Sequence, residues 1–386
     1  MPLPDIAIAA LAAFSLSSLV IHLASVAVAM RRARPPQPLL QAPPGAPAVS
    51  IVRPVCGLDH RLSETLGSSF QLAYPDYEIL FCAASAGDPA IPVVQRLISA
   101  HPGVKARLLV GDDRVSVNPK LNNCVKGWVA ATSSWIVLAD ANVLMPPDYI
   151  QRMLAAWTPG TGLVCSPPVG TDMTGLWSEI EGAFLNGYQA RWQYVADALD
   201  LGFAQGKSML WHRDILESAG GISMLGQEVA EDAAATKLVR QQGLRVRLVQ
   251  GPFPQPLGQR SLSTVWRRQQ RWAQLRRASF PLLYLPELLA GPLLPFLAAL
   301  VAASASGQSA LVAGAGLAAV WYGSELALAR VCGWPLSWRS PIAMICRDLL
   351  LPALYVQGWR DTGFEWRGNA MRADNALTTP AHRGAE

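Results

Sequence analysis

Residues 135–142, Trp-Ile-Val-Leu-Ala-Asp-Ala-Asn, decide the fold. The apolar run 135–139 predicts a buried strand, and Asp140 and Asn142 follow at its carboxyl end. Alternation along an extended chain places residues i and i+2 on the same side, so the carboxylate and the amide face the same way. Such hard oxygen ligands suit Mg²⁺ or Mn²⁺ bridging a diphosphate, although the amide at the second position contributes no charge. The stretch therefore predicts a strand that delivers a metal and phosphate ligand into a cleft.

Further short apolar runs resemble this strand and alternate with helical stretches. The expected strands are 49–52, 78–83, 106–110, 135–139, 162–165 and 246–249, and the expected helices include 89–100, 121–131 and 148–157. Alternating strands and helices predict an α/β domain with a largely parallel sheet, over residues 49–260. In such sheets the ligand site lies at the carboxyl ends of the strands, so polar residues just after strands are the main candidates.

An apolar run precedes this domain. Residues 6–30 are almost uncharged and long enough to cross a bilayer core of ~30 Å, and three arginines follow within residues 31–34. Because the basic residues come after the run, we interpret residues 1–34 as an uncleaved transmembrane anchor with a cytoplasmic basic flank. The Pro-rich residues 35–48 are expected to form a stiff linker.

The residues after the α/β domain are typical of a membrane protein. Residues 261–286 mix arginines with Trp, Phe and Tyr, which predicts an interfacial amphipathic helix or, alternatively, a basic exposed helix with core aromatics. Residues 287–358 hold three apolar stretches, for which we expect at least two transmembrane crossings, since Arg347 and Asp348 interrupt the last stretch. Residues 359–386 are expected to form a loosely ordered polar tail.

The composition supports this division between lipid and water. Mean hydropathy is +0.23 and 15% of residues are charged, against about 25% in an ordinary soluble domain. The net charge of +5 suits an anionic membrane surface or a diphosphate, and the absence of nucleic-acid motifs excludes a nucleic-acid partner. The six cysteines are scattered without zinc spacing, as expected of small core side chains. The Ala-rich chain is typical of bacteria, which predicts an inner-membrane protein with a cytoplasmic catalytic domain.

Two acidic positions besides Asp140 are candidates for the site. Asp88 follows a predicted strand and is placed to accept hydrogen bonds from a base or ribose, although a turn residue capping the next helix is the simpler interpretation. The pair Glu231-Asp232 begins a predicted helix. A carboxylate there suits a general base that deprotonates an acceptor hydroxyl, and the alternative is the preference of helix N-termini for acidic residues.

Three basic or small-residue stretches complete the candidates. Residues 118–123, Asn-Pro-Lys-Leu-Asn-Asn, open a helix, so Lys120 can meet phosphate oxygens. A loop of small residues contains Gly206 and Lys207 and is a candidate for contact with donor or acceptor, without the spacing of a Walker A loop. Arg268-Gln-Gln-Arg271-Trp272 offers cations for a leaving diphosphate and an aromatic face for a sugar, or else a solvated basic stripe.

In order, these motifs resemble those of the membrane-embedded family 2-type glycosyltransferases, whose signature is three aspartates followed by (Q/R)xxRW. The matching positions are Asp88, Asp140, Asp232 and the Arg268-x-x-Arg271-Trp272 stretch. The local strings Gly-Asp-Pro-Ala, Asn-Pro-Lys-Leu-Asn-Asn and Ala-Glu-Asp are similar to those of the ceramide glucosyltransferases. The resemblance extends from about residue 49 to residue 285.

The resemblance implies a GT-A fold and an inverting transfer of a hexose, glucose by analogy, from a UDP-sugar to a ceramide-like lipid. Asp88 would then contact uridine, Asp140 would hold the diphosphate and the Mg²⁺ or Mn²⁺, and Asp232 would be the base. Arg268, Arg271 and Trp272 would support the leaving diphosphate. Alternatives are another acceptor lipid such as a hopanoid, diacylglycerol or sterol, a polysaccharide synthase, and a non-catalytic scaffold with the same fold.

Overall fold

The computed structural model describes residues 4–360, 363–366 and 369–373. The chain forms two compact units, and each is considered by itself. The sheet unit comprises Pro35–Pro168, Ala196–Pro256 and Thr362–Glu386, and the helical unit comprises Met1–Arg34, Val169–Val195 and Leu257–Asp361. Val169–Val195, expected to be part of the α/β domain, thus clusters with the first helix and the C-terminal helices.

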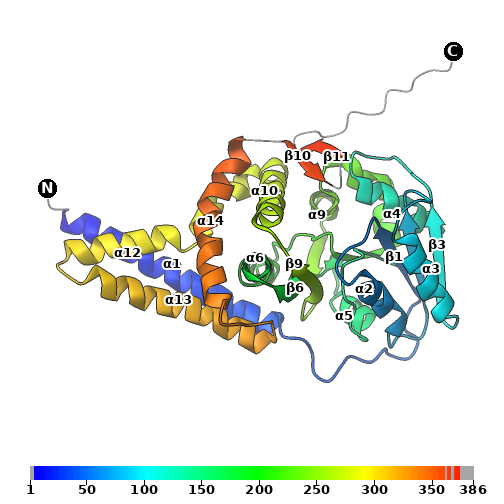
Figure 1. The fold of residues 1–386 in the computed structure, drawn as a ribbon, viewed down its shortest axis with the longest axis horizontal. Helices are drawn as coiled ribbons and strands as arrows, with labels where there is room; N and C mark the ends of the chain where they lie inside the picture. Colours follow the sequence, from blue (N-terminus) through cyan, green and yellow to red (C-terminus); the bar gives the residue numbers. More distant parts are fainter. Residues whose placement is uncertain (1–3, 361–362, 367–368, 374–386) are drawn as a thin grey trace, which may run out of the picture. The chain divides into compact units, whose positions relative to one another are not determined.

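The sheet unit is built on a mixed seven-stranded sheet (Figure 1). Its strands are β1 (Val49–Val55), β2 (Tyr77–Ala83), β3 (Lys105–Val110), β4 (Trp135–Ala139), β5 (Thr161–Cys165), β7 (Ser208–His212) and β8 (Arg245–Leu248), in the order β3-β2-β1-β4-β7-β5-β8. The six expected strands all form. The seventh, β7, is antiparallel to β4 and β5 and was missed, because its first residues were assigned to the preceding loop.

Helices cover this sheet and are held by apolar side chains. They are α2 (Leu62–Gly67), η1 (Ser68–Gln71), α3 (Ile91–Ala100), α4 (Pro119–Ala130), α5 (Tyr149–Ala155), α8 (Arg213–Glu217), η3 (Ile222–Gln227) and α9 (Glu231–Gln241). Helix α4 packs on β1 and β2. Gly127 permits this approach, because a Cβ there would lie 2.4 Å from Val52 Cγ1 and 2.8 Å from Cys82 Sγ.

Two pairs of short strands lie outside the main sheet. β10 (Gly363–Trp366) and β11 (Asn369–Arg372) form an antiparallel pair within the expected polar tail, and residues 374–386 of that tail lie outside the described residues. β6 (Pro168–Thr174) and β9 (Phe253–Gln259) form a separate two-stranded sheet.

The helical unit contains the apolar helices predicted at both ends of the chain. Its helices are α1 (Asp5–Arg32), α6 (Leu176–Ala183), the π-helical turn η2 (Phe184–Ala190), α7 (Arg191–Ala198, which continues into the sheet unit), α10 (Leu262–Ser279), α11 (Pro281–Tyr284), η4 (Leu285–Ala290), α12 (Leu293–Ala305), α13 (Ala310–Cys332) and α14 (Ser340–Arg360). Helices α1, α12 and α13 lie side by side (Figure 1), and α14 packs against α6 and α10.

Two of the described helices, α1 and α13, are long and apolar enough to cross a membrane. The segments Pro281–Ala290 and Leu293–Ala305 meet at a 44° bend and count as a third span if both belong to one crossing. The expected two C-terminal crossings depend on that bent pair.

The charges in the last apolar stretch are accommodated internally: Arg347 is 2.8 Å from Glu325 and 2.7 Å from Asp348, and all three side chains are buried. Pairing of this kind reduces the cost of burying charges among apolar helices.

One buried arginine supports the chain that follows β4. Arg53 is fully buried and donates hydrogen bonds to the carbonyl oxygens of Asp140 (2.9 Å), Ala141 (3.1 Å) and Val143 (2.9 Å). It also donates to the carbonyl oxygen of Thr65 at 2.7 Å. The carbonyl oxygens of Asp140 and Thr65 also accept from Val143 N–H and from the Ser68 hydroxyl, so Arg53 matters most for those of Ala141 and Val143, and it thereby fixes the backbone that presents Asp140.

We predict that Arg53→Met destabilises the sheet unit by about 3 kcal/mol, because it leaves the carbonyl oxygens of Ala141 and Val143 without their donor and removes one donor from those of Asp140 and Thr65. Thermal unfolding of the purified protein in detergent measures the change. Arg107→Met is the matched control, since Arg107 is half-exposed and pairs with Glu78 at the surface of the sheet. Equal melting temperatures for wild type and Arg53→Met would contradict the supporting role.

Candidate active site

The pairing of β4 with β7 brings two loops of the sheet unit together. Ala139 pairs with Ser208, and the Asp140 N–H donates to the Lys207 carbonyl oxygen at 3.0 Å. The small-residue loop therefore ends beside the acidic end of β4. This juxtaposition could not be read from the sequence, because β7 was not recognised as a strand.

The start of α4 is fixed by its capping residue. The Asn118 side chain accepts hydrogen bonds from the N–H groups of Lys120 (2.9 Å) and Leu121 (3.1 Å). Its Nδ2 donates to Glu231 Oε2 at 2.7 Å and to the Val229 carbonyl oxygen at 3.1 Å. Asn118 thus caps one helix and ties it to the start of α9. The sequence analysis gave Asn118 no role of its own, although its position before Pro-Lys is that of an N-cap.

Two lysines enclose the Asp140 carboxylate. Lys120 Nζ lies 2.6 Å from Asp140 Oδ1 and 2.7 Å from Glu231 Oε1, and it also bonds the Gly206 carbonyl oxygen. Lys207 Nζ lies 2.6 Å from Asp140 Oδ2 and 3.3 Å from Asn142 Oδ1. The site therefore contains two ammonium groups, as expected of a cleft that receives a polyanion.

Burial and pairing act in opposite directions on these groups. Burial alone would raise the pKa of the Asp140 carboxyl, but Lys120 and Lys207 outweigh it and hold that pKa well below its usual range. Burial likewise disfavours the Lys120 ammonium, yet the carboxylates of Asp140 and Glu231 raise its pKa above the usual value. Asp140 and Lys120 are consequently both charged at neutral pH.

Asp232 is in a different electrostatic environment. Its Oδ2 accepts from the Gly206 N–H at 3.1 Å and its Oδ1 from its neighbour Ala233 at 2.9 Å. Burial, together with the negative charge of Glu231, raises the pKa of the Asp232 carboxyl to about 6, although Lys120 opposes the shift. A carboxylate with a pKa close to neutrality suits general-base catalysis.

Gly206 lies at the centre of this cluster. A Cβ at this position would lie 2.6 Å from Glu231 Oε1 and 3.0 Å from Lys120 Nζ. The glycine therefore lets its backbone approach both partners of the ion pair while its own N–H meets Asp232. The structure brings together Lys120, Asp140, Glu231, Asp232 and the loop residues Gly206 and Lys207.

Asp88 takes no part in this cluster. Its carboxylate accepts hydrogen bonds from the N–H groups of Gly57 (3.0 Å) and Ala90 (2.8 Å), which joins the loop after β1 to the turn before α3. Such contacts are expected of a turn residue next to a helix, which is the simpler of the two interpretations of Asp88.

The Arg-Gln-Gln-Arg-Trp motif lies on α10 of the helical unit. Arg268 is paired with Glu181 on α6, which is completely buried and also lies 3.0 Å from Arg260 Nε. The Arg268 guanidinium stacks over the Trp272 ring at 5.1 Å from its centroid. Arg268 is thus paired inside the protein, and this pairing was not predicted because nothing in the sequence marks Glu181 as its partner.

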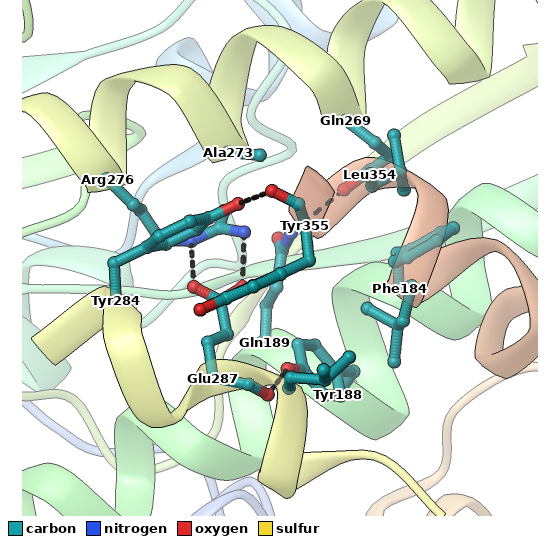
Figure 2. Close-up of a pocket in the computed structure, with 12 residues that line it drawn as sticks. Phe184, Tyr188, Gln189, Gln269, Ala273, Arg276, Tyr284, Glu287, Leu354 and Tyr355 are labelled. Carbon is teal, nitrogen blue, oxygen red and sulfur yellow. Dashed lines mark hydrogen bonds and ion pairs between the residues drawn. The ribbon is translucent and has the colours of Figure 1, made fainter. Parts of the chain in front are cut away.

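The same helix lines a pocket within the helical unit (Figure 2). Arg276 forms a bidentate pair with Glu287, at 3.1 Å and 2.5 Å. Gln189 donates to Gln269 at 3.1 Å, and the Tyr284 hydroxyl donates to the Tyr355 carbonyl oxygen at 3.1 Å. The basic face expected to meet an interface is therefore partly engaged in internal contacts.

The donor set around Asp140 was tested for its fit to a divalent cation. The oxygens of Asp140 and Asn142 already converge on one positive charge, the Lys207 ammonium, so they suit a hard cation. Within residues 4–360, 363–366 and 369–373, no cluster of three or more His, Cys, Asp or Glu residues could hold a metal. A cation at Asp140 would therefore take further ligands from a bound phosphate or from water.

Comparisons with known proteins agree on one family and one fold. The family model described as glycosyl transferase family 21 matches residues 8–378. Ceramide glucosyltransferase 1 from Caenorhabditis elegans is 30% identical over 248 residues, which cover 64% of this chain and 53% of that protein. A ceramide glucosyltransferase from Komagataella phaffii is 37% identical over 121 residues, covering 30% of this chain and 24% of that one. The chain thus spans about half the length of the first of these relatives.

Among solved structures, a mannosyltransferase from Pyrobaculum calidifontis, in complex with GDP-Man and Mn²⁺, is similar to this chain. The TM-score is 0.51 at 19% identity, and the match covers 90% of this chain and 97% of the other. The fold is the GT-A fold, as the motif resemblance implied. Together, these findings describe a chain with the GT-A fold, a match to one family over residues 8–378, and apolar helices long enough to cross a membrane.

We predict that Lys120→Met lowers stability by about 3–5 kcal/mol at pH 7, because it leaves Glu231 and one oxygen of Asp140 without their cation. The loss should shrink on acidification. In the wild type the lowered pKa of Asp140 contributes stability that is fully present above the ordinary pKa of about 3.8 and is lost as the pH falls below it, whereas the variant keeps only the Lys207 pair and has less of this contribution to lose.

Thermal unfolding of both proteins at pH 7 and in steps down to pH 3 measures this difference. Lys126→Met is the matched control, since Lys126 is equally buried but pairs with the exposed Asp113 at 3.3 Å. A stability difference that grows toward low pH would contradict the assigned charges.

Proposed function

The chain belongs to glycosyl transferase family 21, and from this premise we propose that it moves a hexose, glucose by analogy with its relatives, from a UDP-sugar to the primary hydroxyl of ceramide. The transfer inverts the anomeric carbon. The observation that supports this best is the carboxylate of Asp232, whose pKa is raised to about 6, next to the two lysines that pair with Asp140.

The proposed reaction is a single displacement. Asp232 accepts the proton of the acceptor hydroxyl, the hydroxyl oxygen forms a bond to the anomeric carbon, and the bond from that carbon to the diphosphate breaks. UDP leaves with the bonding electrons. Lys120 and Lys207 lie where they can offset its negative charge, and such preorganised charges are a major source of rate enhancement.

Mg²⁺ or Mn²⁺ is part of the proposal. Asp140, with Asn142, would hold the cation, which supplies a further positive charge to the diphosphate when bound. Asp88 is proposed to contact uridine, and Arg268, Arg271 and Trp272 to support the leaving diphosphate. These four roles are supported by the motif resemblance, and Arg268 is itself paired with Glu181.

The proposed location is a bacterial inner membrane, with the sheet unit on the cytoplasmic side. Arg31 and Arg32 lie in the last turn of α1 and Arg34 follows it, and a basic flank of this kind favours the cytoplasmic face. The acceptor lipid and the UDP-sugar would then meet at that face.

A donor-by-acceptor screen tests the substrates. Purified protein in detergent is offered radiolabelled UDP-sugars with ceramide, diacylglycerol or a hopanoid, and the lipid extract is separated by chromatography. A labelled ceramide product is expected. Label on another lipid alone would refute the ceramide assignment, and no labelled lipid from a protein that binds UDP would contradict lipid glycosylation altogether.

Asp232→Asn is expected to lower turnover by at least ~10²-fold, because general-base assistance is worth that much. Binding of UDP, measured by calorimetry, should persist, because Asp232 serves in the proposed mechanism as the base. Its carboxylate accepts a hydrogen bond from a backbone N–H at 3.1 Å. Glu228→Gln is the control, because Glu228 pairs with Lys237 outside the cluster. Near-normal turnover in Asp232→Asn would exclude it as the base.

The pH dependence follows from the same group. Asp232 must be deprotonated to accept a proton, so kcat/KM is expected to fall about tenfold per pH unit below pH 6. Glu231→Gln removes a negative charge that raises the Asp232 pKa, and the acid limb should move to lower pH. A limb that stays in place, or moves up, in Glu231→Gln would contradict this coupling.

A further inference from the structure

Lys207 reaches the Asp140–Asn142 oxygen pair from the turn directly before β7. Its carbonyl oxygen accepts the Asp140 N–H at 3.0 Å, and the next residue, Ser208, is paired with Ala139. The ammonium is therefore delivered by strand pairing rather than by an unconstrained loop. Its side chain is 13% exposed, close to the 19% of Asp140.

The two lysines of the cluster differ in their partners. Lys120 binds Asp140 but is also held by Glu231 and by the Gly206 carbonyl oxygen, which tie it to the start of α9. Among its contacts, the Lys207 ammonium lies 2.6 Å from Asp140 Oδ2 and 3.3 Å from Asn142 Oδ1. Those two oxygens are the ones that a divalent cation would take.

We propose that Lys207 is a displaceable counter-ion of the cation site, so that its ammonium and a divalent cation occupy the Asp140–Asn142 pair alternately. A metal ion entering alone must displace a paired ammonium and leave it without a phosphate partner. A metal ion entering with a nucleoside diphosphate brings its own phosphate ligands, and the displaced ammonium gains a new anionic partner. This second step rests on the proposed use of a nucleotide donor, whereas the competition itself does not.

The consequence is a site that binds metal weakly until nucleotide arrives. Two like charges a few ångströms apart repel each other, and the repulsion is strong in a partly buried cleft. Lys207 therefore lowers the affinity for free Mg²⁺ or Mn²⁺ while keeping the Asp140 carboxylate paired. Removal of its charge should raise that affinity.

Mn²⁺ binding to Lys207→Met, measured by electron paramagnetic resonance without nucleotide, tests the competition directly. The variant is expected to bind Mn²⁺ at least about tenfold more tightly than wild type. Addition of UDP should improve Mn²⁺ binding more in wild type than in the variant. Lys126→Met should bind Mn²⁺ as wild type does, and adding Asp140→Asn to Lys207→Met should remove the gain.

Unchanged or weaker Mn²⁺ binding by Lys207→Met would overturn the proposal, because Lys207 would then not compete with the metal. If that variant melts well below wild type, Lys207→Gln, which keeps polar contact without charge, is read in the same way. The titration needs no sugar transfer. A protein that shows the gain in affinity but no transferase activity would refute the proposed function and leave the competition intact.

Discussion

The ion pair network of Lys120 is the interaction on which the cleft depends. Its ammonium joins three segments far apart in the sequence: the end of β4 at Asp140, the start of α9 at Glu231 and the loop at Gly206. A buried ammonium is tolerated only with such partners, and each carboxylate likewise requires the ammonium. The two aspartates of the cluster consequently have different pKa values. Lys120 and Lys207 hold Asp140 as an anion, whereas burial and the neighbouring Glu231 raise the pKa of Asp232 to about 6.

Much of this arrangement could be predicted from sequence, and the rest has physical reasons for being missed. The six expected strands and the grouping of Lys120, Asp140 and Asp232 follow from apolar runs and from the rule that sites lie at strand ends. Strand β7 follows a loop of small residues and pairs antiparallel, so alternation with helices gave no sign of it. Without β7, the contact of Lys207 with Asp140 was not predictable, and the partnership of Glu181 with Arg268 depends on tertiary packing alone.

The helical unit shows how a membrane-associated chain keeps charged residues among apolar helices. Arg347 pairs with both Glu325 and Asp348, and all three side chains are buried, so the interruption of the last apolar stretch does not expose a charge to lipid. Arg268 and Arg276 are likewise paired with Glu181 and Glu287. The number of arginines in a basic stretch of sequence is therefore larger than the number of positive charges available to a substrate. The ion pairs of each arginine have to be known before that arginine is assigned to a diphosphate.

The central claim is a single displacement assisted by Asp232. The configuration of the product tests it most directly, because one in-line attack inverts the anomeric carbon, whereas a covalent sugar–enzyme intermediate retains its configuration. The anomeric proton of the glycolipid made from an α-linked UDP-sugar can be read by nuclear magnetic resonance. The account predicts a β-linked product, and an α-linked product would contradict it.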